Sequence, residues 1–192
     1  AYTARERGLS VHMDGARVLN ASVASGTSVA EYASGHDSAW LAFTKGLGCP
    51  VGAVLAGSRD FIREAWHFKR MFGGAMRQTG VLTAMCLYAL DHHVERLAED
   101  HTRAKRIETA LRGCSLFGRI FPVDTNIVLA ELSSAAELSA VELRDFLASK
   151  NVKVMAVGTN RIRMITHLDV DDNAVSRLIE GMEAAETVLP SQ

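Results

Sequence analysis

An aspartate and a lysine each stand where a predicted strand ends. Asp14 follows a strand predicted at residues 9–13, and Lys45 follows the apolar run that begins at residue 38 and opens a loop with two glycines and a proline. In open α/β sheets, ligands bind at the carboxyl ends of the strands. Pyridoxal phosphate chemistry needs a lysine that holds the aldehyde and an aspartate that keeps the pyridine nitrogen protonated. The pair therefore predicts a site for this cofactor.

Each of these residues also has an ordinary structural interpretation. Asp14 could cap a helix predicted at residues 16–25 and pair with Arg17, and spacing alone favours that interpretation. Lys45 could reach solvent by its long stem, as loop lysines commonly do. The chemical interpretation instead expects Lys45 to be poorly solvated, because burial favours the free amine that a Schiff base needs.

The elements that must position these residues alternate between strands and helices. Short apolar runs bounded by turn residues are typical of buried strands in an α/β sheet, and they lie at residues 38–44 and 51–56. A further strand is predicted at residues 9–13. A long apolar helix is predicted at residues 79–97, where it should be buried on most sides, in part against another subunit. Further along the chain, pairs of strands between helices indicate an α+β layer.

The composition argues against several other classes of protein. The chain has 192 residues, with 21 Lys+Arg against 22 Asp+Glu, so the net charge is −1 and a nucleic-acid partner is not expected. No apolar run approaches the roughly 20 residues of a membrane span. The three cysteines form no CxxC pair and no histidine spacing is typical of a metal site, so we expect no bound metal, reduced thiols and a cytoplasmic protein.

Four motifs occur in series along the chain and together resemble a known family. They are HMDGAR at residues 12–17, TKGLGCPVG at 44–52, GGAMRQTG at 73–80 and RMITHLD at 163–169. This series resembles the L-threonine aldolase family, which belongs to the aspartate-aminotransferase-like (type I) pyridoxal phosphate enzymes. The resemblance covers essentially the whole chain.

The resemblance implies an α/β fold in two parts. Residues 1–96 would be the C-terminal part of the cofactor-binding large domain, with a mainly parallel sheet and helices, and residues 97–192 a small α+β domain. Subunits of the family are considerably longer and usually form homotetramers. We therefore expect a homo-oligomer, and we expect this chain to be the C-terminal part of a subunit whose N-terminal section is missing.

The resemblance also assigns roles to individual residues. Lys45 corresponds to the lysine that binds the cofactor aldehyde, and Asp14 to the partner of the pyridine nitrogen. Arg17 lies where the family has an arginine near the cofactor and the substrate carboxylate. Arg163 corresponds to the small-domain arginine that binds the α-carboxylate. Arg77 falls where basic residues approach the cofactor phosphate.

The alternation of residues 161–167 predicts a strand with two different faces. Ile162, Met164 and Thr166 fall on one face, and Arg161, Arg163 and His167 on the other. A planar guanidinium suits bidentate binding of a carboxylate. A solvated strand face is the simpler interpretation of Arg161.

The function expected from the resemblance is pyridoxal-phosphate-dependent aldol cleavage. L-threonine, L-allo-threonine or related β-hydroxy-α-amino acids would yield glycine and an aldehyde. Two alternatives stay open at this point: another type I β-eliminating lyase or aminotransferase, and a catalytically silent fragment that only assembles.

Overall fold

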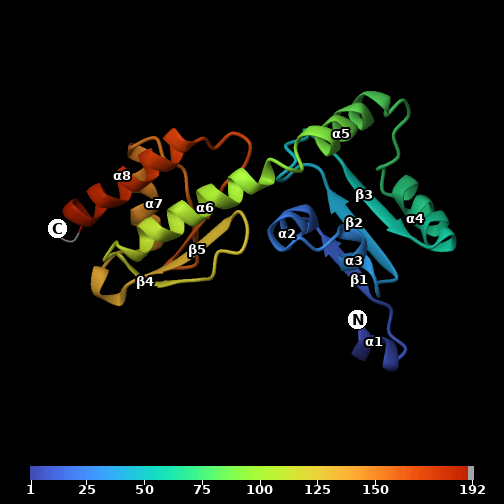
Figure 1. The fold of residues 1–192 in the computed structure, drawn as a ribbon, viewed down its shortest axis with the longest axis horizontal. Coiled ribbons are helices and arrows are strands. Elements are labelled where there is room, and N and C mark those ends of the chain that lie inside the picture. Colours follow the sequence, from blue (N-terminus) through green and yellow to red (C-terminus); the bar gives the residue numbers. More distant parts are fainter. Residues whose placement is uncertain (190–192) are drawn as a thin grey trace. The chain divides into compact units, whose positions relative to one another are not determined.

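The computed structural model describes residues 1–189, which divide into two compact units after Leu97 (Figure 1). This division falls beside the domain boundary predicted at residue 96. Each unit has its own sheet and helices, and each is described by itself below.

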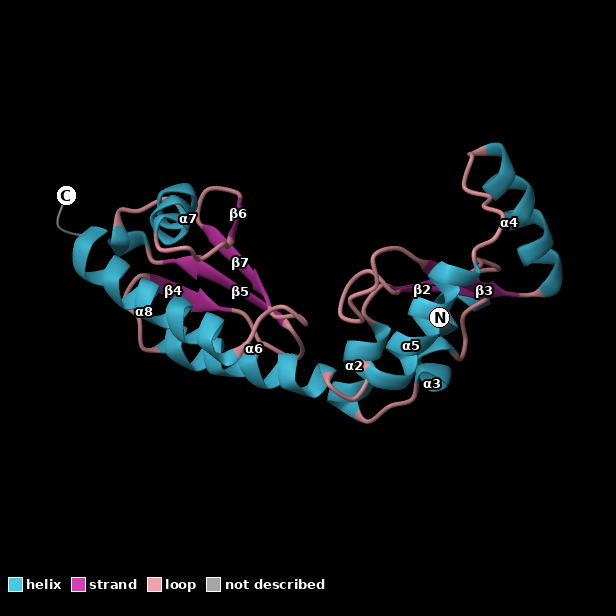
Figure 2. Ribbon diagram, turned by 90° about the horizontal axis from the view of Figure 1, so that it is seen from above, coloured by secondary structure: helices cyan, strands magenta, loops and turns pink. Residues whose placement is uncertain are grey.

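The N-terminal unit contains a three-stranded sheet with strand order β1-β2-β3 (Figure 1; β2 and β3 are also labelled in Figure 2). Strands β1 (His12–Gly15) and β2 (Ser38–Ala42) are parallel, and the crossover between them contains α2 (Val18–Ser25) and α3 (Val29–Ala33). The short helix α1 (Tyr2–Glu6) precedes β1 and is followed by Gly8, which adopts a left-handed φ of 67°. The predicted strand–helix–strand alternation is therefore present.

Strand β3 (Ala53–Gly57) departs from the expected parallel, buried arrangement. It runs antiparallel to β2, because residues 43–52 form a loop with no crossover helix to return the chain to the other end of the sheet. All five of its residues are exposed. The sheet of this unit is therefore mixed.

The long apolar helix predicted at residues 79–97 is shorter in the structure, where α5 spans Gly80–His92 and α6 (Leu97–Arg112) begins a new segment. Helix α4 (Arg59–Met71) precedes α5. Helix α5 ends just before His93. The Nδ1 atom of His93 lies 2.7 Å from the carbonyl oxygen of Leu47, within hydrogen-bonding distance. Only Ala89 of α5 is buried, so the expected burial on most sides does not occur among the described residues; its exposed large side chains are Val81, Met85, Leu87, Tyr88 and Leu90.

The C-terminal unit is an antiparallel sheet packed against helices. Its strand order is β4-β5-β7-β6, formed by β4 (Phe117–Ile120), β5 (Ile127–Leu132), β7 (Arg161–Ile165) and β6 (Met155–Val157). Its other helices are the short 3₁₀ turn η1 (Ser134–Ala136), α7 (Ala140–Ser149) and α8 (Asp172–Val188). No helix in the described part of the chain is both long and apolar enough to cross a membrane.

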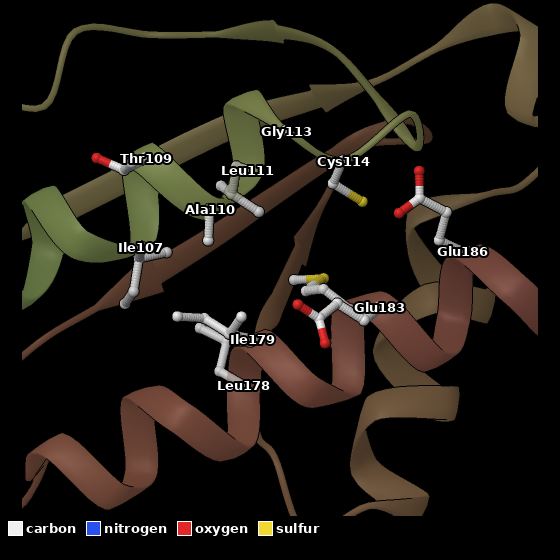
Figure 3. Close-up of a pocket in the computed structure, with 11 residues that line it drawn as sticks. Ile107, Thr109, Ala110, Leu111, Gly113, Cys114, Leu178, Ile179, Glu183 and Glu186 are labelled. Atoms are coloured by element: carbon white, nitrogen blue, oxygen red, sulfur yellow. The ribbon is translucent and has the colours of Figure 1, made fainter.

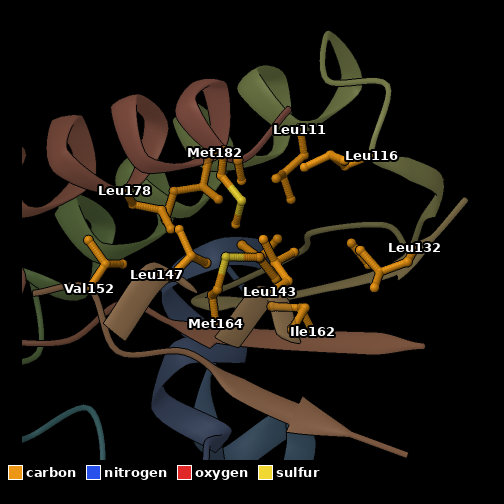
Figure 4. Close-up of a cluster of buried hydrophobic side chains, with 14 of the residues drawn as sticks. Leu111, Leu116, Leu132, Leu143, Leu147, Val152, Ile162, Met164, Leu178 and Met182 are labelled. Carbon is orange, nitrogen blue, oxygen red and sulfur yellow. The ribbon is translucent and has the colours of Figure 1, made fainter. Parts of the chain in front are cut away.

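Alternating residues of the central strands build the core of the C-terminal unit (Figure 4). Val128, Ala130 and Leu132 of β5 are buried together with Ile162 and Met164 of β7. These side chains form one cluster with buried residues of α6, α7 and α8. The predicted alternation of residues 161–167 is confirmed, and it leaves the two arginines of β7 on the opposite face.

A matched pair of substitutions on α7 tests this packing. Leu143 is completely buried, so Leu143→Ala should lower the free energy of unfolding by about 2–5 kcal/mol through lost burial and a residual cavity. Val141, on the same helix, is 43% exposed, and Val141→Ala should change it by less than about 0.5 kcal/mol. Urea denaturation of the full-length protein measures both, and equal losses would contradict the assignment of the buried face.

Candidate active site

The parallel pairing of β1 with β2 places Asp14 beside Trp40. The two residues are register partners, so their side chains leave the same face of the sheet. His12 and Ser38, two residues earlier on each strand, are also register partners. Their side chains meet on this face, because His12 Nδ1 lies 2.8 Å from Ser38 Oγ. The close pairing requires Gly15, because a Cβ atom there would collide with the carbonyl oxygen of Trp40.

Trp40 also lies beside the candidate catalytic lysine. The ammonium of Lys45 is 5.2 Å from the centroid of the Trp40 ring. A cation over an indole face at an exposed site is stabilised by about 0.5–1 kcal/mol. The structure therefore brings Lys45 to the face of the sheet that carries Asp14. Trp40 was not singled out from the sequence, although its alternation with residues 38 and 42 places it on this face.

The loop that carries Lys45 is held by its own backbone and by buried apolar side chains. The Cys49 N–H donates a hydrogen bond to the carbonyl oxygen of Phe43 at 2.9 Å. The Gly48 N–H donates to the carbonyl oxygen of Lys45, also at 2.9 Å. Phe43 and Leu47 are buried in a small cluster, whereas Lys45 is exposed. The expectation that Lys45 is poorly solvated is therefore wrong for the described residues, because the loop turns its apolar side chains inward and its lysine outward.

Asp14 does not cap a helix, contrary to its ordinary interpretation. Its Oδ1 accepts a hydrogen bond from the Ala16 N–H at 3.0 Å, which is a local turn between β1 and α2. The N-cap position of α2 is Arg17, and α2 starts at Val18. This hydrogen bond orients an exposed carboxylate at the end of β1.

Arg17 lies where the turn after β1 meets the Lys45 loop. Its half-buried side chain lines a small cavity together with Asn20 and Gly46. Gly46 permits this close approach, because a Cβ atom there would stand 2.9 Å from Asn20 Oδ1. The segments that carry Asp14, Arg17 and Lys45 are therefore in contact.

Arg77 lies apart from this group in the structure. It is exposed in the loop between α4 and α5, next to Gln78, which has a left-handed φ of 50°. Within residues 1–189, no hydrogen bond or ion pair joins Arg77 to the other candidate residues. Its predicted role at the cofactor phosphate stays a prediction.

The two arginines of β7 differ in their charge partners. Arg161 donates from Nε and Nη2 to Glu131 Oε1, at 2.8 and 2.7 Å, across the β5–β7 pair. Arg163 is half-buried between its register partners Leu129 and Met155, and no acidic side chain in the described part of the chain pairs with it. Arg163 can therefore receive a carboxylate from outside, whereas Arg161 is already neutralised.

The groups of the N-terminal unit fit pyridoxal phosphate chemically. An exposed primary amine can bind an aldehyde, an oriented carboxylate can accept a pyridinium N–H, and both leave the same face of one sheet. Among residues 1–189, no group of three or more His, Cys, Asp or Glu side chains is arranged to hold a metal ion.

Comparisons with known proteins show which family the chain is similar to. The beta-eliminating lyase family matches residues 1–135. The low specificity L-threonine aldolase of Escherichia coli (strain K12) is 40% identical over 166 residues, which are 86% of this chain and 48% of that protein. A probable low-specificity L-threonine aldolase 2 of Arabidopsis thaliana is 36% identical over 181 residues, covering 94% and 51% respectively. The chain thus spans about half the length of these curated relatives.

A solved structure shows the same fold. The putative L-allo-threonine aldolase of Listeria monocytogenes superimposes with a TM-score of 0.77 and 23% identity over 95% of this chain and 54% of that one. The expected α/β fold of type I pyridoxal phosphate enzymes is therefore confirmed, and family and fold together imply that cofactor. The resemblance to L-threonine aldolases is confirmed by the curated relatives, and the chain belongs to the beta-eliminating lyase family.

Proposed function

We propose that the full-length protein is a pyridoxal-phosphate-dependent aldehyde-lyase. Its substrates would be L-threonine, L-allo-threonine or related β-hydroxy-α-amino acids, and its products glycine and an aldehyde, which is acetaldehyde for threonine. The observation that carries this proposal is that Asp14 and the Lys45 ammonium lie on one sheet face, beside Trp40. The names of the curated relatives support the choice of substrate.

The residues of this chain would divide the work of binding and proton transfer. Lys45 Nζ would hold the cofactor aldehyde and, once released by the substrate amine, could accept or return a proton. Asp14 would keep a proton on the pyridine nitrogen, with its carboxylate oriented by the Ala16 N–H. When bound, pyridoxal phosphate supplies a ring that accepts the electron pair left when the Cα–Cβ bond breaks. Arg17 would lie near the cofactor and the substrate carboxylate, and Arg77 would bind the phosphate.

Arg163 would bind the α-carboxylate of the substrate. Its planar guanidinium can donate two parallel hydrogen bonds to a carboxylate, and no acidic side chain among the described residues competes for it. Arg161 lacks this freedom, because Glu131 already occupies its Nε and Nη2. The contrast supports Arg163 as the substrate-binding arginine of the C-terminal unit.

Assembly into a homotetramer and a cytoplasmic location complete the proposal. Helix α5 leaves large apolar side chains exposed, including Val81, Leu87 and Tyr88, and assembly would cover such a surface. All three cysteines are free thiols, which suits a reducing compartment.

Product analysis tests the reaction directly. The full-length protein, supplied with pyridoxal phosphate and L-threonine, should release glycine and acetaldehyde in equal amounts. Release of a 2-oxo acid and ammonia would instead identify a β-eliminating lyase. Transfer of the amino group to an added 2-oxo acid would identify an aminotransferase.

Replacing Asp14 by asparagine separates its charge from its local turn. Asn keeps a side-chain oxygen for the Ala16 N–H but removes the negative charge, so the turn should survive. We expect Asp14→Asn to lower kcat by about 100-fold or more, because the pyridine nitrogen loses its charge partner. Steady-state kinetics, with cofactor content measured by absorbance, would show this, and an unchanged kcat would mean that Asp14 only forms the turn.

The arginines of β7 provide a second matched pair. Arg163→Lys keeps the charge but loses the bidentate geometry, and it should cost about 2–4 kcal/mol in kcat/KM, mostly through KM. Arg161→Lys should cost less than about 1 kcal/mol, because its exposed ion pair with Glu131 is not part of the site. If Arg161→Lys is the damaging change, the carboxylate role belongs to Arg161.

A further inference from the structure

Two free thiols meet where the Lys45 loop packs against α5. Cys49 lies in the loop and is only 7% exposed, whereas Cys86 lies within α5 and is half-buried. Cys49 Sγ donates to the carbonyl oxygen of Met85 at 3.6 Å, and Cys86 Sγ donates to that of Val51 at 3.9 Å. Each sulfur therefore contacts the backbone within two residues of the other cysteine, and both cysteines belong to the same apolar cluster.

The surroundings make the two thiols unequal. Burial, and after it the adjacent Cys86 thiol, raises the pKa of Cys49 above its ordinary value. A thiol that stays protonated is a poor first nucleophile toward an oxidant. The more exposed Cys86 is therefore the cysteine that an oxidant in solution would reach first.

The third cysteine serves as an internal comparison. Cys114 belongs to the C-terminal unit, where it lines a groove between α6 and α8 with Glu183 and Glu186 (Figure 3). Burial is the main cause that raises the pKa of its thiol, and the Glu186 carboxylate adds to it. Cys114 therefore has carboxylates in place of a second thiol.

We propose that Cys49 and Cys86 are a redox modification site, which a hydroperoxide converts to a reversible disulfide. The Cys86 thiolate attacks the peroxide, the O–O bond breaks, and a sulfenic acid and an alcohol (water for hydrogen peroxide) form. Cys49 sulfur then attacks Cys86 sulfur, the S–O bond breaks, and water leaves. Two thiols lose two electrons and two protons in total, and the peroxide is reduced. A dithiol reductant reverses the bond by thiol–disulfide exchange.

The disulfide would act on the loop that positions Lys45. A disulfide holds its two sulfurs about 2.05 Å apart, so forming it would draw Cys49 and Cys86 together. The backbone hydrogen bonds of Cys49 to Phe43 and of Gly48 to Lys45 transmit a shift of Cys49 to the lysine. A misplacement of about 1 Å can lower turnover on the order of 100-fold. This consequence rests on the proposed function, whereas the disulfide itself does not.

Intact mass and peptide mapping of the full-length, cofactor-loaded protein test the disulfide. A small molar excess of hydrogen peroxide should remove two hydrogen atoms of mass per subunit and yield one linked peptide pair containing Cys49 and Cys86. Cys114→Ser should form the same link. Cys86→Ser should form none, and dithiothreitol should restore all thiols of the oxidised protein.

The outcomes separate this inference from the proposed function. The proposed disulfide would be overturned by retention of all three thiols, by overoxidation of Cys86 without a link, or by a link through Cys114. Threonine cleavage should fall at least tenfold on oxidation, recover with dithiothreitol, and persist in peroxide-treated Cys86→Ser. A disulfide that leaves cleavage unchanged would overturn the connection to Lys45. A reduced protein that never cleaves threonine would contradict the proposed function while the mass measurement still decides the disulfide.

Discussion

The parallel pairing of β1 with β2 determines where both candidate catalytic groups lie. It sets Asp14 opposite Trp40, and the indole then receives the Lys45 ammonium from the loop that follows β2. A shift of one residue in this register would turn Asp14 to the other face of the sheet. Gly15 protects the register, since any larger residue would strike the Trp40 backbone. The chemistry of the N-terminal unit thus depends on one strand pair.

In the C-terminal unit, the alternation of side chains along β7 separates a buried face from a face that carries arginines. One face of β7 is buried in the core, so its other face can present arginines without breaking the packing. Glu131 on the neighbouring strand then neutralises Arg161 and leaves Arg163 without an acidic partner among the described residues. Two residues of equal charge and similar position therefore acquire different capacities to bind a carboxylate.

The sequence predicts those features that depend on local pattern. Asp14 lies near the end of β1 as expected, and the alternation around Arg163 matches the structure, whereas β2 ends at Ala42 and Lys45 follows it in the loop. Features that depend on contacts between distant segments could not be predicted. The exposed Lys45 reflects loop side chains that pack inward, and the end of α5 reflects the bond from His93 to a carbonyl oxygen of that loop. The antiparallel direction of β3 likewise follows from its connection and not from its composition.

Borohydride reduction of the full-length, cofactor-loaded protein tests directly whether Lys45 is the lysine that binds the cofactor. Reduction fixes the cofactor to the lysine that binds it, and peptide mapping identifies that lysine by mass. We expect the cofactor mass on the peptide containing Lys45. Lys45→Arg should abolish this labelling, and Lys69→Arg, on exposed helix α4, should leave it unchanged. Labelling of a different lysine, or undiminished labelling of Lys45→Arg, would contradict the assignment of Lys45.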